Sequence, residues 1–190
     1  MENLDLYLAS GSPRRKELLQ QLDYQFEVIR VDVEEQQQQG ETSTDYVRRL
    51  AQDKAQAGVK SIQTSTPVLG ADTIVVVDNR VLEKPQGIDH AKEMLILLSG
   101  REHQVMTAVC IADKNHYRTI LVTTSVWFKH LSEQEILNYW HSGEPCDKAG
   151  GYGIQGVGGK FVTRIEGSYH AVVGLPLMET EQLLKEFKNI

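Results

Sequence analysis

The sequence has 190 residues, of which 41% are hydrophobic and 24% are charged, and its formal net charge is −6 at pH 7. This composition is ordinary for a globular protein and excludes a chain that is wholly disordered, collagen-like or coiled-coil. The acidic balance argues against binding of nucleic acid through bulk positive charge, but a few well-placed cations could still hold a small anion.

The chain shows no membrane or export signal and little use of cysteine. No apolar run approaches the roughly 20 residues of a membrane helix, and MENLDLYLAS lacks the basic and apolar regions of a secretory signal. Cys110 and Cys146 are too few for a disulfide framework or a four-thiolate metal site. We therefore expect a cytoplasmic protein in a reducing compartment.

Hydrophobic periodicity predicts a mixed central β-sheet flanked by helices, which is an α/β fold. The first half is predicted as a strand at 4–9, a helix from Pro13, a strand at 26–31, an exposed tract at 34–45, a helix ending near Gly58, and a strand hairpin at 68–77 and 81–83. The second half is predicted as a helix at 88–98, strands at 105–112 and 119–128, a helix from a capping box at Ser132, a glycine-dense loop at 143–159, strands at 161–165 and 169–173, and a helix from Pro176.

The first candidate site is the loop SGSPRR, residues 10–15, which lies between a predicted strand and the following helix. The free N–H groups of a first helical turn attract anions, and arginine grips phosphate oxygens two at a time. Arg14 and Arg15 oppose the usual preference for acids there, which makes sense if an anion lies between them and the helix. Solvated arginines on a capped helix remain an equal alternative.

The second candidate is Lys54, which shares a helical stripe with Val47, Leu50, Ala51 and Gly58. This spacing turns Lys54 toward the core side of its helix. Taken alone, a lysine whose ammonium reaches the edge of the core is favoured over one that binds an anion.

The third candidate is Asp72, followed by Thr73, inside the apolar run VLGADTIVVV. A carboxylate in a buried strand needs a cation, a metal or a role as a base. The alternative is a strand that emerges into solvent, or a buried aspartate that bonds backbone N–H groups. The hairpin is predicted to bring Glu83 and Lys84 near Asp72, either as a salt bridge or as part of a phosphate and metal site. Gly70 would leave space for a ligand beside Asp72.

The glycine-dense loop contains Gly151, Gly153 and Gly156 in the spacing of a dinucleotide-binding motif. We reject that interpretation because no strand leads into the motif and a predicted strand follows it instead of a helix. The glycines more plausibly shape a tight loop that brings Gln155 to a ligand, and a surface loop without function is the alternative. The six histidines show no zinc-binding spacing.

Taken together, these segments resemble the Maf family of nucleoside triphosphate pyrophosphatases. The matching segments are LASGSPRRKELL, VLGADTIVVVDNRVLEKP, SGREHQVMTAV, GEPCDKAGGYGIQGVGGKFV and GSYHAVVGLP, in that order. The forms DKAGGYGIQG and VVGLP resemble the branch that acts on dTTP and UTP. Gly151 stands where the family usually has alanine, which affects no catalytic position.

The resemblance implies a single domain over residues 1–190 with two lobes around a cleft, related to the inosine triphosphatase fold. It also implies dependence on a divalent cation (Mg²⁺ or Mn²⁺), frequent homodimers, and hydrolysis between the α and β phosphates. Asp72 falls on the general base, and Asp72 with Glu34 on the metal-associated acids. Substrate contacts fall on Ser10, Ser12, Arg14, Arg15, Lys54, Thr73, Lys84 and Gln155.

Chemistry agrees with these residue types, because arginines and lysines offset the charge of a triphosphate, and Gln155 offers both the donor and the acceptor that match the imide edge of uracil or thymine. We also expect some activity toward modified pyrimidine nucleotides. Two alternatives stay open: a nucleotide-binding regulator of septum formation without catalysis, and a sister enzyme for a modified guanosine triphosphate.

Overall fold

The computed structural model describes residues 4–188, so the first three and last two residues of the predicted domain lie outside the described range. The chain divides into two compact units. Unit 1 contains the described residues through Asp72, the segment Thr107–Val122 and the chain from Gly174 onward, whereas unit 2 contains Thr73–Met106 and Thr123–Val173. This division agrees with the prediction of two lobes.

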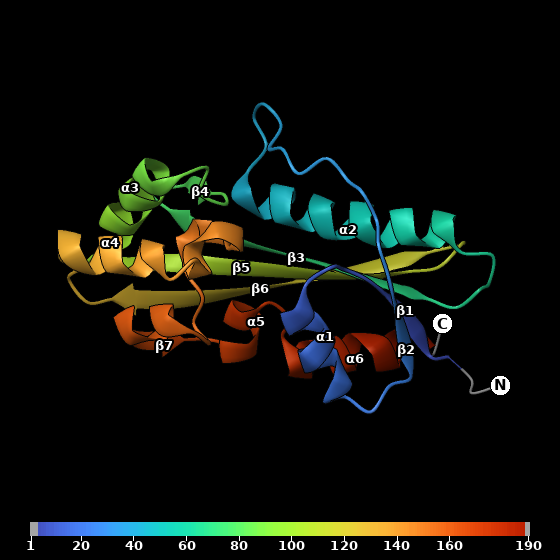
Figure 1. Cartoon of the computed structure of the whole chain (residues 1–190). Coiled ribbons are helices and arrows are strands. Elements are labelled where there is room, and N and C mark those ends of the chain that lie inside the picture. Colours follow the sequence, from blue (N-terminus) through green and yellow to red (C-terminus); the bar gives the residue numbers. More distant parts are fainter. Residues whose placement is uncertain (1–3, 189–190) are drawn as a thin grey trace. The chain divides into compact units, whose positions relative to one another are not determined.

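One seven-stranded sheet has the strand order β2-β1-β3-β5-β6-β7, with β4 paired to β3 (Figure 1). β1 (Leu6–Ala9) runs parallel to β2 (Phe26–Ile29) and to β3 (Val68–Val77). β4 (Arg80–Leu82) is antiparallel to β3, and β7 (Val162–Glu166) is antiparallel to β6 (Tyr117–Phe128). The sheet is therefore mixed, as predicted.

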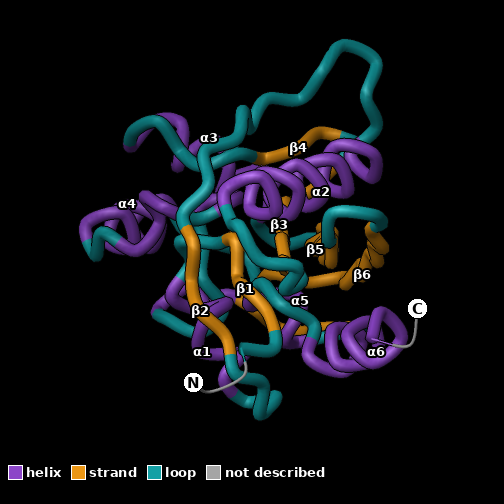
Figure 2. Tube along the Cα trace, turned by 90° about the vertical axis from the view of Figure 1, so that its right-hand side faces the viewer, coloured by secondary structure: helices purple, strands orange, loops and turns teal. Residues whose placement is uncertain are grey.

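Unit 1 combines β1 and β2 with α1 (Pro13–Gln20), α2 (Ser43–Ser61) and α6 (Leu177–Lys188). Figure 2 shows β1 and β2 side by side. α2 begins after Thr42, whose side chain accepts a hydrogen bond from the Asp45 N–H at 3.1 Å, and it runs three residues past the predicted end near Gly58. The predicted stripe of α2 from Val47 to Gly58 is buried, with Lys54 in it.

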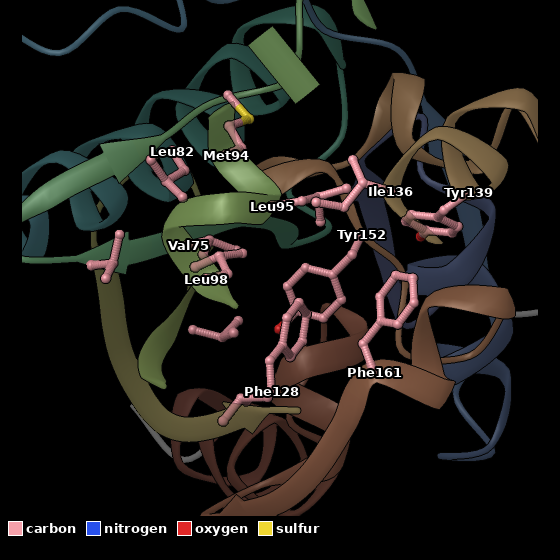
Figure 3. Close-up of a cluster of buried hydrophobic side chains, with 13 residues drawn as sticks. Val75, Leu82, Met94, Leu95, Leu98, Phe128, Ile136, Tyr139, Tyr152 and Phe161 are labelled. Carbon is pink, nitrogen blue, oxygen red and sulfur yellow. The ribbon is translucent and has the colours of Figure 1, made fainter. Parts of the chain in front are cut away.

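Unit 2 contains α3 (Ile88–Leu98), α4 (Glu133–His141), β4, β7 and part of β5 (Glu102–Ala112). The predicted capping box is present, because Ser132 and Glu135 exchange side-chain-to-backbone hydrogen bonds at the start of α4. A buried cluster unites these elements with the glycine-dense loop (Figure 3). Its aromatic members are Phe128, Tyr139, Tyr152 and Phe161.

The glycine-dense loop is not uniformly irregular. It contains three short 3₁₀ turns, at Glu144–Asp147, Ala149–Gly151 and Val157–Phe161. The prediction of a loop is correct in that no strand or α-helix forms there.

The predicted strand at residues 169–173 is wrong, because these residues form the short helix α5 (Tyr169–Val173). The two valines favour a strand, but Ser168 acts as a helix cap. Its hydroxyl oxygen accepts from the Ala171 N–H at 3.1 Å, and its carbonyl accepts from the Val172 N–H at 3.2 Å. This local capping outweighs the weak preference of two β-branched residues.

None of the helices within residues 4–188 combines the length and the apolar character that crossing a bilayer requires.

Candidate active site

A buried ion pair lies at the centre of the candidate site in unit 1. Asp72 on β3 is 7% exposed and Lys54 on α2 is 9% exposed. The Lys54 Nζ donates to Asp72 Oδ1 at 2.7 Å. Lys54 is therefore not a lysine that merely extends its ammonium to solvent, and the predicted need of Asp72 for a cation is met by this lysine.

Gly70 explains how the two side chains meet. A Cβ at position 70 would lie 2.5 Å from both the Ala51 carbonyl oxygen and the Ala55 nitrogen, so α2 packs directly on the β3 backbone. Residues 70 and 72 share one face of the strand, and Lys54 lies beside Ala55 on the helix. The space at Gly70 that we assigned to a ligand is thus filled by α2, and the close packing brings Lys54 to Asp72.

A second carboxylate reaches the same ammonium. Glu35 Oε1 lies 2.7 Å from Lys54 Nζ, so the two carboxylate oxygens are no more than twice that distance apart. Both Glu34 and Glu35 are exposed, and it is Glu35, not the Glu34 to which the resemblance assigns a metal role, that makes this contact. The irregular backbone of the loop decides which of the two adjacent acids reaches Lys54, and no local sequence signal distinguishes them.

Arg49 on α2 fixes the loop that carries Glu35. Its Nε donates to Glu41 Oε1 at 2.6 Å, and its Nη2 donates to the Gln36 carbonyl at 2.9 Å. The predicted exposed tract at 34–45 is therefore pinned to α2 by a charged side chain that the sequence analysis did not single out.

The SGSPRR loop presents Ser10 and Arg15 in a constrained arrangement. Ser10 is buried, and its Oγ accepts from the Ser12 N–H at 3.2 Å and from Arg15 Nη1 at 3.4 Å. Arg15 Nε also donates to the Gly174 carbonyl at 2.9 Å. Ser12 caps α1 as predicted, because its Oγ accepts from the Arg15 N–H. Arg14 and Arg15 are both half-buried.

The charges of unit 1 act on one another. Burial raises the pKa of Asp72 above its ordinary value, although the positive charges of Lys54 and Arg15 pull it down, and Glu35 adds to the rise. Burial lowers the pKa of Arg15, which Asp72 opposes, and an arginine remains charged in this setting. Arg15, Lys54, Asp72 and Glu35 therefore form one electrostatic cluster.

Three predicted site residues belong to unit 2. Thr73 is half-buried, whereas Lys84 and Gln155 are exposed. The ladder between β3 and β4 ends at Val75 and Leu82, and beyond it the Glu83 carbonyl accepts from the Gly150 N–H at 3.2 Å. The structure thus assembles Ser10, Arg15, Lys54 and Asp72, while Thr73, Lys84 and Gln155 stay predictions as substrate contacts.

The donor set fits a hard divalent cation that arrives with its ligand. Asp72 and Glu35 supply the carboxylate oxygens that Mg²⁺ prefers, and such ions often bind through one or two carboxylates plus substrate phosphates. Across residues 4–188, no group of three or more histidine, cysteine, aspartate and glutamate side chains could hold a metal by itself. Both carboxylates at Lys54 are compensated by its ammonium.

Comparisons with known proteins address the whole chain. The chain is 67% identical over 186 residues to a protein of Aliivibrio fischeri named dTTP/UTP pyrophosphatase. The alignment covers 96% of this chain and 97% of the relative. A protein of Photobacterium profundum with the same name is 61% identical and covers 100% of both chains.

Among solved structures, the Ham1 protein of Staphylococcus aureus aligns over 65% of this chain and 71% of its own, with 16% identity and a TM-score of 0.47. The profile of the Maf-like protein family matches residues 5–187, nearly the full length. The chain therefore belongs to the Maf family.

Proposed function

We propose that this protein is a nucleoside triphosphate pyrophosphatase, a hydrolase of nucleotide metabolism that converts dTTP and UTP to the monophosphate and pyrophosphate. Relatives that share 60–67% of its residues over nearly their whole length carry that name. The observation that carries the proposal is the buried Asp72 on β3, held at 2.7 Å by Lys54.

The cations of unit 1 suit a polyphosphate. Lys54 and Arg15 are held by neighbouring groups before substrate arrives, so binding loses little side-chain entropy. The first turn of α1 begins directly after Ser12, and the partial positive charge of this helix end attracts phosphate oxygens. Arg14 adds charge at the same helix end.

Asp72 is the proposed general base. Burial raises its pKa, which makes it a better proton acceptor than an ordinary aspartate. A water oxygen attacks the α-phosphorus, Asp72 accepts the proton of that water, and the bond between the α-phosphorus and the bridging oxygen breaks. Pyrophosphate leaves with the electron pair of that bond. Positive charge from Lys54 and Arg15 stabilises the charge that develops on the phosphates.

Divalent-metal dependence is part of the proposal. Asp72 and Glu35 would hold the ion together with substrate phosphates, and Glu34 stays a predicted contributor from the neighbouring position. A bound Mg²⁺ or Mn²⁺ would supply charge neutralisation and lower the pKa of water.

Substrate choice is assigned to Arg14, Thr73 and Gln155, with Lys84 as a further phosphate contact. The amide of Gln155 offers a donor and an acceptor, which matches the imide edge of uracil and thymine and mismatches cytosine.

A cytoplasmic location and a homodimer complete the proposal. The two free cysteines are compatible with a reducing compartment, and the dimer rests on the resemblance alone.

The test is a panel of common and modified nucleoside triphosphates, each assayed for pyrophosphate and monophosphate release with Mg²⁺, Mn²⁺ or a chelator. We expect dTTP and UTP to turn over fastest and the chelator to abolish turnover. Faster turnover of a modified guanosine triphosphate would select the sister specificity. Tight nucleotide binding without product after long incubation would favour the regulator. Sedimentation at several protein concentrations tests the dimer.

A further inference from the structure

The carboxylate of Glu144 is the hub of the glycine-dense loop in unit 2. Oε1 accepts from the Tyr139 hydroxyl at 2.6 Å and from the Gly158 N–H at 3.0 Å, and Oε2 accepts from the Val157 N–H at 2.7 Å. Both oxygens of the carboxylate are thus bonded to donors. Charge-assisted hydrogen bonds of this kind are about twice as strong as neutral ones.

Tyr139 extends this contact to a second point of the loop. While its hydroxyl donates to Glu144, its oxygen accepts from the Gly153 N–H at 3.1 Å. The Tyr139 ring is buried in the aromatic cluster, so its hydroxyl is a fixed point (Figure 3). The loop is therefore attached at Gly153 and again at residues 157–158.

Gln155 lies between these two attachment points, two residues from Gly153 and two from Val157. It is exposed. The backbone on one side of Gln155 is held by the Tyr139 hydroxyl, and the backbone on the other side is held by the Glu144 carboxylate. Both groups therefore act on Gln155 through the backbone.

Close packing explains the glycines around Gln155. A Cβ at Gly156 would lie 2.1 Å from Glu144 Oε2, and a Cβ at Gly158 would lie 2.5 Å from the Tyr139 hydroxyl oxygen. Gly156 has a φ of −104°, which other residues also adopt, so contact with Glu144 rather than backbone strain requires glycine there. Among the three glycines that imitate a dinucleotide motif, Gly156 is required by contact with Glu144, a Cβ at Gly153 would first meet the Lys148 side chain at 2.6 Å, and Gly151 has a φ of +71°.

The charge state of Glu144 suits this role. Burial alone would raise the pKa of Glu144, but hydrogen bonds from Tyr139, Gly158 and Val157 outweigh burial and hold the pKa below its ordinary value. The lowered pKa favours the ionised carboxylate, which can only accept hydrogen bonds.

We propose that Glu144 is a positioning residue for nucleobase selection, which acts through Tyr139 and the 153–158 backbone to fix Gln155. This inference rests on the proposed function. A fixed amide penalises cytosine because the mismatched donor or acceptor stays unpaired, whereas a loose loop lets the amide withdraw and reduces that penalty. The phosphate cluster of unit 1 does not depend on these hydrogen bonds.

The test compares Glu144→Gln with the wild type and with Glu93→Gln, which removes an exposed carboxylate from α3 in the same unit. For Glu144→Gln we expect the ratio of kcat/KM for UTP to that for CTP to fall about tenfold. The loss should appear as a higher KM for UTP with kcat nearly unchanged. Amide hydrogen exchange should accelerate at residues 153–158 and not in the β-strands. Glu93→Gln should match the wild type.

Tyr139→Phe is the second variant, because it keeps the buried ring and removes the hydroxyl that bonds both Glu144 and Gly153, while the Glu144 carboxylate and its bonds to Val157 and Gly158 stay in place. It should lower the UTP to CTP ratio by about threefold, and it tests the inference if Glu144→Gln does not fold. An unchanged ratio in folded variants, even with reduced thermal stability, would make Glu144 purely structural and overturn the inference. A wild type that releases no pyrophosphate from UTP or dTTP would instead refute the proposed function, and this inference with it.

Discussion

Each of the two units buries a polar pair, and the two pairs are satisfied in opposite ways. In unit 1 the Lys54 Nζ and the Asp72 Oδ1 form a buried ion pair, 2.7 Å apart. In unit 2 the ring of His103, 2% exposed, shares a hydrogen bond of 2.7 Å between its Nε2 and the Tyr152 hydroxyl. Burial lowers the pKa of His103 to about 4, so this histidine is neutral at pH 7.

The surroundings of the two pairs account for the difference. His103 packs edge-on against the rings of Phe128 and Tyr152, an apolar setting that favours the neutral imidazole. The pair in unit 1 has Glu35 and the charge of Arg15 nearby, so charge compensates charge. A buried ion pair is a poor way to gain stability, since apolar replacements often do as well. Its retention in unit 1 is explained by chemistry, whereas the pair in unit 2 is explained by packing.

The largest expected effect comes from Asp72→Asn, which removes the proposed base while keeping an oxygen that accepts from Lys54. Loss of a general base typically costs about 10²–10⁴-fold in rate. We expect kcat for pyrophosphate release from UTP to fall by that factor, with a smaller change in KM. Stopped assays of pyrophosphate under saturating UTP measure this.

Asp32→Asn is the matched control for Asp72→Asn, because Asp32 is an exposed aspartate of unit 1. It should retain wild-type turnover. If folded Asp72→Asn keeps kcat within about twofold of the control, Asp72 is not the base. The proposed contrast, in which the Lys54–Asp72 pair serves catalysis and the His103–Tyr152 pair serves packing, would then be wrong for the pair in unit 1.

Lys54→Met sharpens the comparison through stability. It leaves the Asp72 carboxylate buried without its ammonium, and breaking a buried pair on one side costs about 3–5 kcal/mol in the free energy of unfolding. The double variant Lys54→Met with Asp72→Asn should recover part of that loss, because position 72 then carries no buried charge, and the Glu35 carboxylate is 40% exposed to solvent. Urea denaturation of the wild type, both single variants and the double variant gives the coupling energy.

Lys60→Met serves as the control for Lys54→Met, since Lys60 is exposed on the same helix. Its effect should lie within about 0.5 kcal/mol of zero. A coupling energy near zero between positions 54 and 72 would mean that the observed 2.7 Å contact is energetically silent.

Much of this organisation is predictable from the sequence. The bounds of β3 and α3 match the prediction to the residue, because one is a ten-residue apolar run and the other ends at Gly100, whose φ of 69° suits glycine. The inward direction of Lys54 also follows from helical periodicity alone. These features depend on local patterns, which a single sequence displays directly.

Features that depend on distant contacts escape such prediction. The resemblance places a metal role on Glu34, beside Glu35, and that role stays a prediction. The fold brings Glu35 to Lys54, in a loop that Arg49 holds through Glu41. The roles of Thr73, Lys84 and Gln155 stay predictions for the same reason.

His103 lies upstream of the predicted strand at 105–112. β5 begins at Glu102, three residues earlier than predicted. Residues 102 and 104 are exposed and residues 103 and 105 are buried, and this alternation is the pattern that would have predicted the longer strand.

The smallest of the three effects concerns the pair in unit 2 and is a dependence of stability on pH. His103 has a pKa of about 4 in the folded protein against 6.5 for an ordinary histidine. Between these values the unfolded chain binds a proton that the folded chain does not, so stability falls as the pH drops from 6.5 toward 4. The shift corresponds to roughly 2–3 kcal/mol at the acid end.

His103→Gln removes this titration while leaving a polar partner for the Tyr152 hydroxyl. We expect the variant to be less stable at pH 7 but to lose less further stability by pH 4.5, so the two curves of unfolding free energy against pH converge. His141→Gln, at an exposed position of α4, should run parallel to the wild type. Parallel curves for His103→Gln as well would show that His103 takes up its proton without unfolding. The folded protein would then accommodate a protonated His103, as unit 1 accommodates its ion pair. The contrast between a charged pair and a neutral pair would in that case rest on Asp72 and Lys54 alone.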